Sequence, residues 1–343
     1  MITIPGFSPA VRWYRFRNAA ERMGVTEIDL YDDGKFTRKN WAEDLAGYFA
    51  ENGLSWDLVW TNLYTEPMQG ILDALREYGA KVVVDVDDLF TAVPKGNLAH
   101  SHWHGRGRQQ YTQLIKEADR VVTSTPYLAD VHGAEVAYNF IEPSQWDFEA
   151  RVKSDPDEVV ILFSGGTGRA GDYMATAKPI KAAMDLPNTK MVFMGAFPEW
   201  ALRYPAGKAI WCRWVPIELY PKMLRWIDPD IMVSPLEHNE FNLAKSNLKW
   251  LEAGAVGSAF VGERWGEYER TVEDGVTGVL AEGGQEWTDK LVWLCTNEAE
   301  RAKIAATGQA EVLRNWTWDK VGPLWERAVL GKVAAETEFE RVA

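Results

Sequence analysis

Short runs of apolar and β-branched residues alternate along this chain with longer segments in which apolar residues recur every three to four positions. The short runs are typical of buried strands, and the longer segments are typical of amphipathic helices. The pattern predicts strands at residues 2–4, 27–30, 57–60, 80–86, 120–123, 135–138, 158–163, 190–194, 209–212, 231–233, 258–261 and 278–280. It predicts helices at 11–23, 41–52, 67–78, 245–253, 286–296, 298–314 and 316–329.

Strands that are apolar along their whole length, with helices between them, indicate parallel sheets covered on both faces. The alternation stops at 142–157, a polar stretch rich in Pro, Ser and Asp, and then resumes. We therefore predict an α/β fold with two Rossmann-like, doubly wound domains that face a cleft, where ligands are expected, and a C-terminal helix that crosses back to the first domain. The expected boundaries are 1–145 for the first domain, 146–157 for a linker, 158–315 for the second domain and 316–343 for the C-terminal helix and tail.

Charge and cysteine content narrow the function classes. The chain has 50 acidic and 37 basic residues, so its formal net charge is −13. Such a surface repels a polyphosphate backbone, which argues against DNA as a partner. The two cysteines, Cys212 and Cys295, show no disulfide or metal-site spacing, and no apolar run approaches the ~18 residues that span a bilayer. We therefore expect a cytoplasmic protein without a transmembrane segment.

A glycine-rich turn, Phe163-Ser-Gly-Gly-Thr-Gly-Arg169, follows a predicted strand directly. Its glycines, Gly165 and Gly166 among them, allow backbone N–H groups to approach an anion, and the start of the following helix adds partial positive charge. The Arg169 guanidinium is able to donate two parallel hydrogen bonds to a phosphate. The alternative interpretation is a plain glycine turn.

A second segment combines cations with a carboxylate. A helix that starts near Ala244 would carry Lys245 at its beginning, where an anion docks, and Ser246 beside it. Lys249 and Glu252 follow four and seven residues after Lys245, so all three would share one face of the helix. A carboxylate at Glu252 can accept two hydrogen bonds from a ribose diol. The alternative is an amphipathic helix whose charges face water.

These segments resemble the nucleotide-sugar-binding domain of group-1 retaining glycosyltransferases, which have the GT-B fold. The likeness lies in residues 158–169, in Lys245-Ser-Asn-Leu-Lys-Trp-Leu-Glu-Ala-Gly254 and in the turn Glu273-Asp-Gly-Val-Thr-Gly278, whose N–H groups would hold a sugar hydroxyl or a phosphate oxygen. The first half resembles the acceptor domain of the same enzymes, in the stretches 12–15, 82–88, 118–125 and 138–139.

The resemblance implies transfer of a sugar from a UDP-, GDP- or dTDP-sugar to a hydroxyl of a glycan, lipid, protein or small molecule, with retention at the anomeric carbon. It implies no cofactor and no bound metal, because cations stabilise the leaving diphosphate. Arg169 and Lys245 match the two diphosphate-binding positions, Glu252 matches the ribose-binding carboxylate, and Gly165 and Gly166 fall in the phosphate-approach loop. Ser246 adds a donor contact.

Two departures from the family pattern concern the donor sugar. The glutamate that usually stands eight positions before the ribose-binding one is replaced by Ala244, so Asn242 or Glu240 is expected to contact the donor sugar instead. The Lys that usually follows the arginine is absent, and Asp172 lies nearby.

The acceptor side is expected to use acids, a histidine loop and two arginines. Asp85, Asp87 and Asp88 cluster at the carboxyl end of a strand, where Asp87 would orient the acceptor hydroxyl or accept its proton. An oxygen-ligand metal site is the alternative for this cluster. The loop 98–108 contains His100, His102 and His104, and we expect it to contact the acceptor through His102, with a metal clip as the alternative. Arg12 and Arg15 would contact the acceptor or the donor phosphates, with surface ion pairs as an equal alternative.

Two rival functions remain open on the sequence. A nucleotide-sugar epimerase on the same fold would need no acceptor. A non-catalytic carbohydrate- or nucleotide-binding protein is favoured by Ala244 and by the 17 tryptophans, whose flat faces stack on sugar rings.

Overall fold

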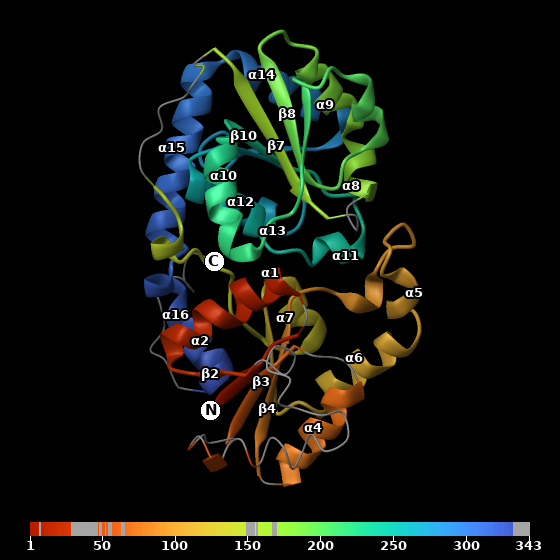
Figure 1. Cartoon of the computed structure of the whole chain (residues 1–343), viewed down its shortest axis with the longest axis vertical. Coiled ribbons are helices and arrows are strands. Elements are labelled where there is room, and N and C mark those ends of the chain that lie inside the picture. The colour runs from red at the N-terminus through yellow and green to blue at the C-terminus, as the bar shows by residue number, and fades with distance from the viewer. Residues whose placement is uncertain are drawn as a thin grey trace. The chain divides into compact units, whose positions relative to one another are not determined.

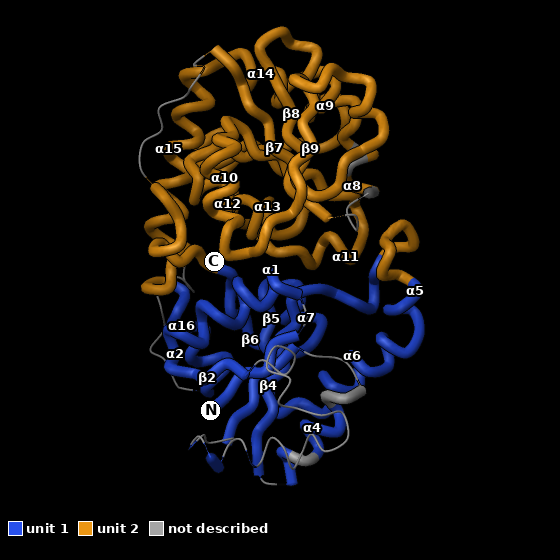
Figure 2. Tube along the Cα trace, viewed as in Figure 1, with its two compact units in different colours: residues 1–93, 101–139, 321–338 blue, residues 94–100, 140–320, 339–343 orange. Residues whose placement is uncertain are grey.

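The computed structural model describes residues 1–6, 8–28, 47, 50–51, 53, 57–62, 66–77, 79–148, 155, 157–166 and 170–331. The chain divides into two compact units, shown in different colours in Figure 2. Unit 1 consists of Met1–Val93, Ser101–Asn139 and Val321–Glu338. Unit 2 consists of Pro94–His100, Phe140–Lys320 and Phe339–Ala343. Each unit contains one parallel sheet.

The sheet of unit 1 has, among the described residues, six strands in the order β2-β1-β3-β4-β5-β6 (Figure 1). Every neighbouring pair is parallel. The strands are β1 Ile2–Ile4, β2 Thr26–Glu27, β3 Leu58–Thr61, β4 Lys81–Val86, β5 Arg120–Thr123 and β6 Glu135–Val136. The helices are α1 Pro9–Val11, α2 Asn18–Met23, α4 Glu66–Glu77, α5 His100–Trp103, α6 Arg106–Glu117 and α7 Pro126–His132.

The sheet of unit 2 likewise has six described strands, in the order β12-β11-β10-β7-β8-β9, and all pairs are parallel. The strands are β7 Val159–Gly165, β8 Thr189–Gly195, β9 Ala209–Cys212, β10 Ile231–Ser234, β11 Ala259–Glu263 and β12 Val279–Ala281. The helices are α8 Ala170–Ala175, α9 Ala177–Met184, α10 Tyr220–Ile227, α11 Glu240–Leu243, α12 Leu248–Val256, α13 Glu267–Thr271, α14 Gly283–Thr296 and α15 Glu298–Asn315. The prediction of two Rossmann-like units is confirmed.

Burial on both faces explains the uniformly apolar strands of unit 2. Every residue of β7 is buried. Its odd-numbered side chains, such as Phe163, join a core with Ile180 of α9 and Leu291 of α14. Its even-numbered side chains point to the other face, where α10 and α12 lie. A strand with helices on both faces has no position for a polar side chain except at its end.

The predicted helix at 245–253 begins later than expected, at Leu248. The Asn239 side chain accepts a hydrogen bond from the Asn242 N–H at 2.9 Å, and this cap starts the separate short helix α11. Lys245 donates its backbone N–H to the Asn242 carbonyl at 3.1 Å, in the turn that follows α11. Lys245 therefore lies on the connection between α11 and α12, and it shares no helix with Lys249 and Glu252.

The C-terminal helix α16, Trp318–Leu330, crosses back to unit 1, as predicted. From Val321 onward its residues belong to unit 1. Trp325 is buried and donates its indole N–H to the Tyr138 carbonyl at 2.9 Å. Its ring packs edge-on against the Trp60 ring, with 5.6 Å between the ring centres. Helix α16 therefore completes the core of the first unit.

Arg15 and Asp85, which the sequence analysis assigned to the acceptor, form a buried ion pair in this core. Arg15 lies in a π-helical segment, Arg12–Arg17, between α1 and α2. Its Nε and Nη2 donate to the Asp85 Oδ1 and Oδ2 at 3.0 and 2.9 Å, and its guanidinium lies 4.3 Å from the centre of the Trp325 ring. Arg15 is 1% exposed and Asp85 is 0% exposed, so both belong to the core of unit 1. Burial raises the pKa of Asp85, and the Arg15 charge opposes that rise.

Arg15→Met is expected to destabilise the protein by about 3–5 kcal/mol, because it leaves the Asp85 carboxylate buried without its partner. The matched control is Arg12→Met on the same helical segment. Arg12 pairs with Glu27, and its side chain is 25% exposed, so its loss should cost about 1 kcal/mol or less. Urea unfolding monitored by circular dichroism measures the free energy of unfolding of both variants. Equal losses in the two variants would contradict a structural role for the Arg15–Asp85 pair.

Candidate functional site

The strand order of unit 2 reverses between β7 and β10, because the chain runs from β7 to β8 and β9 on one side and then returns to β10 on the other. Ligands in doubly wound sheets bind at the carboxyl ends of the strands beside such a reversal. Gly165, Gly166 and Ser234 stand at these ends. A Cβ added to Gly166 would meet no atom within 4 Å, so the backbone there is open to an approaching group.

The predicted donor residue Arg169 lies outside the described residues, together with the preceding Thr167 and Gly168. Described residues on either side define the turn around it. Gly165 ends β7 and its carbonyl accepts the Ala196 N–H at 2.9 Å, which ties the turn after β7 to the loop after β8. The chain resumes as α8 at Ala170.

Glu252 lies at the centre of a hydrogen-bonded cluster beside the glycine turn. Its carboxylate is 1% exposed and accepts hydrogen bonds from the Tyr220 hydroxyl at 2.8 Å and from the Lys249 Nζ at 2.6 Å. The Tyr220 hydroxyl also lies 2.9 Å from the Ser164 Oγ, directly before Gly165. The sequence left open whether Lys249 binds the donor or faces water. In the structure, Lys249 is half-buried and bound to the Glu252 carboxylate.

Tyr220 is a component of the cluster that sequence reasoning missed. It is the first residue of α10 and stands 32 positions before Glu252. Pro216 and Pro221 surround a short 3-10 turn and mark the start of that helix, but neither indicates where the tyrosine hydroxyl points. The Tyr220 hydroxyl meets Glu252 because α10 and α12 pack on the same face of the sheet.

Lys245 and Ser246 are half-buried on the connection between α11 and α12. The Lys245 ammonium lies 4.2 Å from the centre of the Phe241 ring, a cation–π geometry. The ring of Phe241 is buried. The lysine is therefore positioned by α11, whereas Glu252 is positioned by α12.

Asn242 ties two helices together. Its side-chain nitrogen donates to the Asp172 Oδ1 at 3.0 Å and to the Glu237 carbonyl at 2.9 Å, which uses both amide hydrogens. Asp172 is buried and also accepts the Glu237 N–H at 2.8 Å. Asn242 thus links α11 to α8, the helix that follows the glycine turn, and only its carbonyl oxygen remains for the expected contact with a donor sugar.

The turn Glu273–Gly278 uses its own N–H groups, against the expectation that they hold a ligand. Gly275 donates to the Gly278 carbonyl at 2.7 Å, and Val276 and Thr277 both donate to the Glu273 carbonyl at 3.0 Å. The Trp250 indole donates to the Thr277 carbonyl at 2.9 Å. Three N–H groups of the turn are therefore engaged within it, and its Thr277 carbonyl anchors Trp250 of α12.

A histidine–carboxylate pair stands at the carboxyl end of β11 and was also missed by sequence analysis. The His238 Nε2 lies 3.1 Å from the Glu263 Oε1, and the Trp287 indole donates to Glu263 Oε2 at 2.8 Å. The His238 ring stacks on Trp265 with 4.2 Å between ring centres. Burial raises the pKa of Glu263, and the hydrogen bonds from Trp287 and His238 act in the opposite direction.

In unit 1, Asp87 and Asp88 are half-buried directly after β4. Burial and then the negative charges of these two carboxylates raise the pKa of the Tyr111 phenol, whose oxygen lies 2.8 Å from the His132 Nε2. Tyr111 and His132 are thus neighbours of the predicted acceptor acids that the sequence pattern did not indicate. His102 is exposed on α5.

Arg12 is held by Glu27, as the ion-pair alternative anticipated. Within the part of the chain that the structure describes, no three His, Cys, Asp or Glu side chains are gathered so that they could hold a metal ion. No described helix is long and apolar enough to cross a membrane.

Comparison with known proteins concerns part of unit 2 and the fold of the chain. Residues 177–323 match a family model described as glycosyl transferase-like. The fold is similar to that of solved glycosyltransferase structures over nearly the whole chain. The chain carries a glycosyltransferase-like domain and has the GT-B fold.

Three solved structures illustrate the likeness. Anabaena HepE in complex with UDP and glucose has a TM-score of 0.64 at 13% identity, and the match covers 96% of this chain and 99% of that one. A glycosyltransferase from Rickettsia africae has a TM-score of 0.62 at 11% identity, over 97% and 99% of the two chains. Sucrose-phosphate synthase from Thermosynechococcus elongatus has a TM-score of 0.61 at 13% identity, over 90% and 82%. No curated protein matches this sequence.

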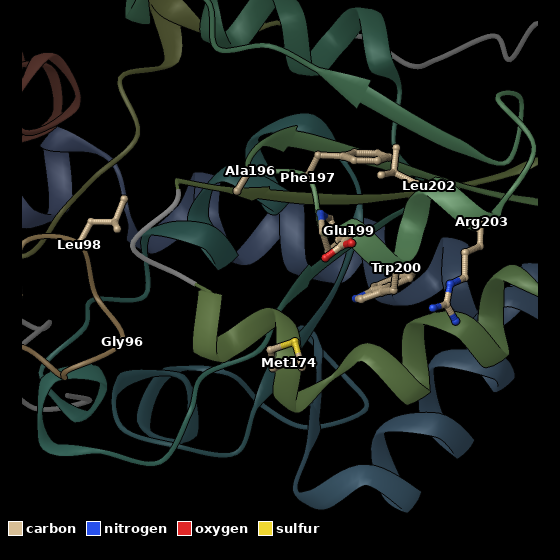
Figure 3. Close-up of a pocket in the computed structure, with 10 residues that line it drawn as sticks. Gly96, Leu98, Met174, Ala196, Phe197, Glu199, Trp200, Leu202 and Arg203 are labelled. Atoms are coloured by element: carbon tan, nitrogen blue, oxygen red, sulfur yellow. The ribbon is translucent and has the colours of Figure 1, made fainter.

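The GT-B unit 2 also contains a cavity of about 750 Å³ on the other side of the glycine turn (Figure 3). Phe197 and Trp200, from the loop after β8, and Met174 of α8 line the same space. The remaining lining residues are Gly96, Leu98, Ala196, Pro198, Glu199, Leu202 and Arg203. The walls are mainly apolar, in contrast to the Glu252 cluster.

Proposed function

We propose that this chain transfers a sugar from a nucleoside diphosphate to a hydroxyl acceptor, with retention at the anomeric carbon and without a bound metal. UDP-glucose is the first donor to test, since HepE of the same fold has been crystallised with UDP-glucose. The observation that carries the proposal is the Glu252 carboxylate, held by Tyr220 and Lys249 beside the glycine turn, in which the backbone at Gly166 is open.

The proposed role of each residue follows from its charge. The Gly165–Gly166 turn and Arg169 hold the diphosphate, and Lys245 adds a cation next to the carboxyl end of β10. Negative charge grows on the leaving diphosphate as the glycosidic bond breaks, so cations fixed in advance lower the barrier. Glu252 accepts hydrogen bonds from the ribose hydroxyls. Asp87 of unit 1 orients the acceptor hydroxyl or accepts its proton.

Lys245→Ala and Arg169→Ala are each expected to lower kcat for UDP-sugar turnover by about 10²-fold or more, because each removes a charge that stabilises the departing diphosphate. The readout is UDP release from UDP-glucose, with and without acceptor, and NMR of the donor alone distinguishes transfer from epimerisation. Lys303→Ala, on the exposed face of α15, is the matched control and should turn over normally. Unchanged rates in both site variants would show that the phosphate site is elsewhere.

Tyr220→Phe is expected to weaken recognition of the ribose, because it removes the hydroxyl that orients Glu252 and keeps the ring. The measurement is the affinity for UDP relative to 2′-deoxy-UDP and 3′-deoxy-UDP by calorimetry. A hydrogen bond to a charged group predicts about tenfold or greater preference for UDP in the natural protein, reduced at least about threefold in the variant.

The matched control is Tyr268→Phe, which removes another buried hydroxyl at the same sheet edge, bound to the Ser234 Oγ at 2.8 Å. It should keep the full preference for UDP. No preference in the natural protein would remove Glu252 from the ribose site. A preference that survives in Tyr220→Phe would assign Tyr220 to folding alone.

A further inference from the structure

The cavity beside the glycine turn exposes more apolar surface than a protein surface normally keeps in one place. Leu98, Met174 and Leu202 are 77%, 71% and 72% exposed, and all three line it together with Phe197 and Trp200. Its volume of about 750 Å³ is in the range of small-molecule sites, which are mostly apolar with a few polar groups. Contiguous exposed apolar side chains of this kind mark a binding surface.

The position of the cavity connects it with the proposed donor site. Ala196 forms part of its wall and donates its N–H to the Gly165 carbonyl at 2.9 Å. Met174 belongs to α8, the helix that starts directly after the glycine turn. The cavity and the Glu252 cluster therefore flank the same turn, one on the α8 side and the other on the α10 and α12 side of the sheet.

The third wall comes from the segment predicted to contact the acceptor. Gly96 and Leu98 line the cavity, and they belong to Pro94–His100 of unit 2. The histidine loop that sequence analysis assigned to the acceptor begins at Leu98. A wall from the acceptor segment and a wall from the donor turn thus enclose one apolar space.

We infer that this cavity receives the hydrocarbon part of an amphipathic acceptor, whose hydroxyl is directed to the glycine turn. The inference rests on the proposed function and narrows its acceptor class from any hydroxyl compound to an alcohol or glycoside with an apolar group. Glu199 and Arg203 stand on the 3-10 turn Glu199–Arg203 at the cavity and carry opposite charges, so the cavity favours no net charge on this part of the ligand.

The test compares n-octyl β-glucoside with methyl β-glucoside, which present the same sugar hydroxyls and differ in the chain. Each buried methylene strengthens binding about fourfold, so an octyl chain that is at least half buried should bind about 10²-fold more tightly. Calorimetry with the whole chain gives the dissociation constants of the two glucosides. The octyl glucoside is kept below the concentration at which it forms micelles. Phenyl β-glucoside and the butyl and hexyl homologues distinguish an aromatic group from an alkyl chain.

Leu202→Glu and Met174→Glu place a charge in the cavity at side chains that already face solvent, so the fold should tolerate them. Both should reduce the preference for the octyl chain at least about tenfold. Leu313→Glu is the matched control on α15, outside the cavity, at a leucine that is 38% exposed. It should keep the preference.

The inference is overturned if the natural protein binds the two glucosides equally, or if the cavity variants retain the preference as fully as Leu313→Glu. It is also overturned if the natural protein is a dimer that Leu202→Glu dissociates, because the cavity then receives a second copy of the chain. UDP is titrated in parallel. Absence of UDP binding contradicts the proposed function, whereas UDP binding without a chain preference contradicts the acceptor inference alone.

Discussion

Burial of each parallel sheet on both faces is the constraint from which the site follows. A strand such as β7, buried from Val159 to Gly165, has room for polar groups only where it ends. The polar groups of unit 2 accordingly appear at the last positions of their strands: Ser164 on β7, Ser234 on β10 and Glu263 on β11. Because all strands are parallel, these ends meet at one edge of the sheet. The strand reversal between β7 and β10 opens that edge to a ligand.

Two buried carboxylates show how the same chemistry serves structure in one place and binding in another. Asp85 and Arg15 are 0% and 1% exposed, and a carboxylate that is fully paired and shielded by its neighbours has no access to a substrate. Glu252 is 1% exposed, but Lys249 is half-buried, and both stand at the open edge of the sheet. In both cases, burial of the charge is tolerated because a cation and further hydrogen bonds accompany it. What separates the two pairs is their surroundings: the Arg15 guanidinium lies over the Trp325 ring in the core of unit 1, whereas Glu252 is linked through the Tyr220 hydroxyl to Ser164, directly before the glycine turn.

The sequence was sufficient for the two parallel-sheet units and for most of their strands. Uniformly apolar runs located the strands, since only burial on both faces produces them. Side-chain contacts determine the features that the sequence did not predict. The Asn239 cap starts a separate short helix, α11, which ends at Leu243, so the helix that periodicity placed at 245–253 starts at Leu248. The pairing of Arg15 with Asp85 joins positions 70 residues apart, and no local pattern distinguishes such a charge from one that faces a ligand. In the same way, no local pattern indicated that the Tyr220 hydroxyl contacts Glu252, 32 residues later.

The two sides of the glycine turn in unit 2 differ in the kind of ligand they can hold. On the side of α10 and α12, hydrogen bonds converge on Glu252, and such a cluster selects for hydroxyls with defined geometry. On the side of α8 lies the apolar cavity, which is the proposed site for a hydrocarbon group. The hydrogen bond from Ala196 to Gly165 holds the cavity wall beside the turn, so the proposed acceptor and donor sites are adjacent. Catalysis of a transfer between two substrates gains from such adjacent sites, because orienting both reactants removes the entropic cost of their encounter. Selectivity for the donor would then depend on polar contacts and selectivity for the acceptor on apolar burial, so each could change without loss of the other.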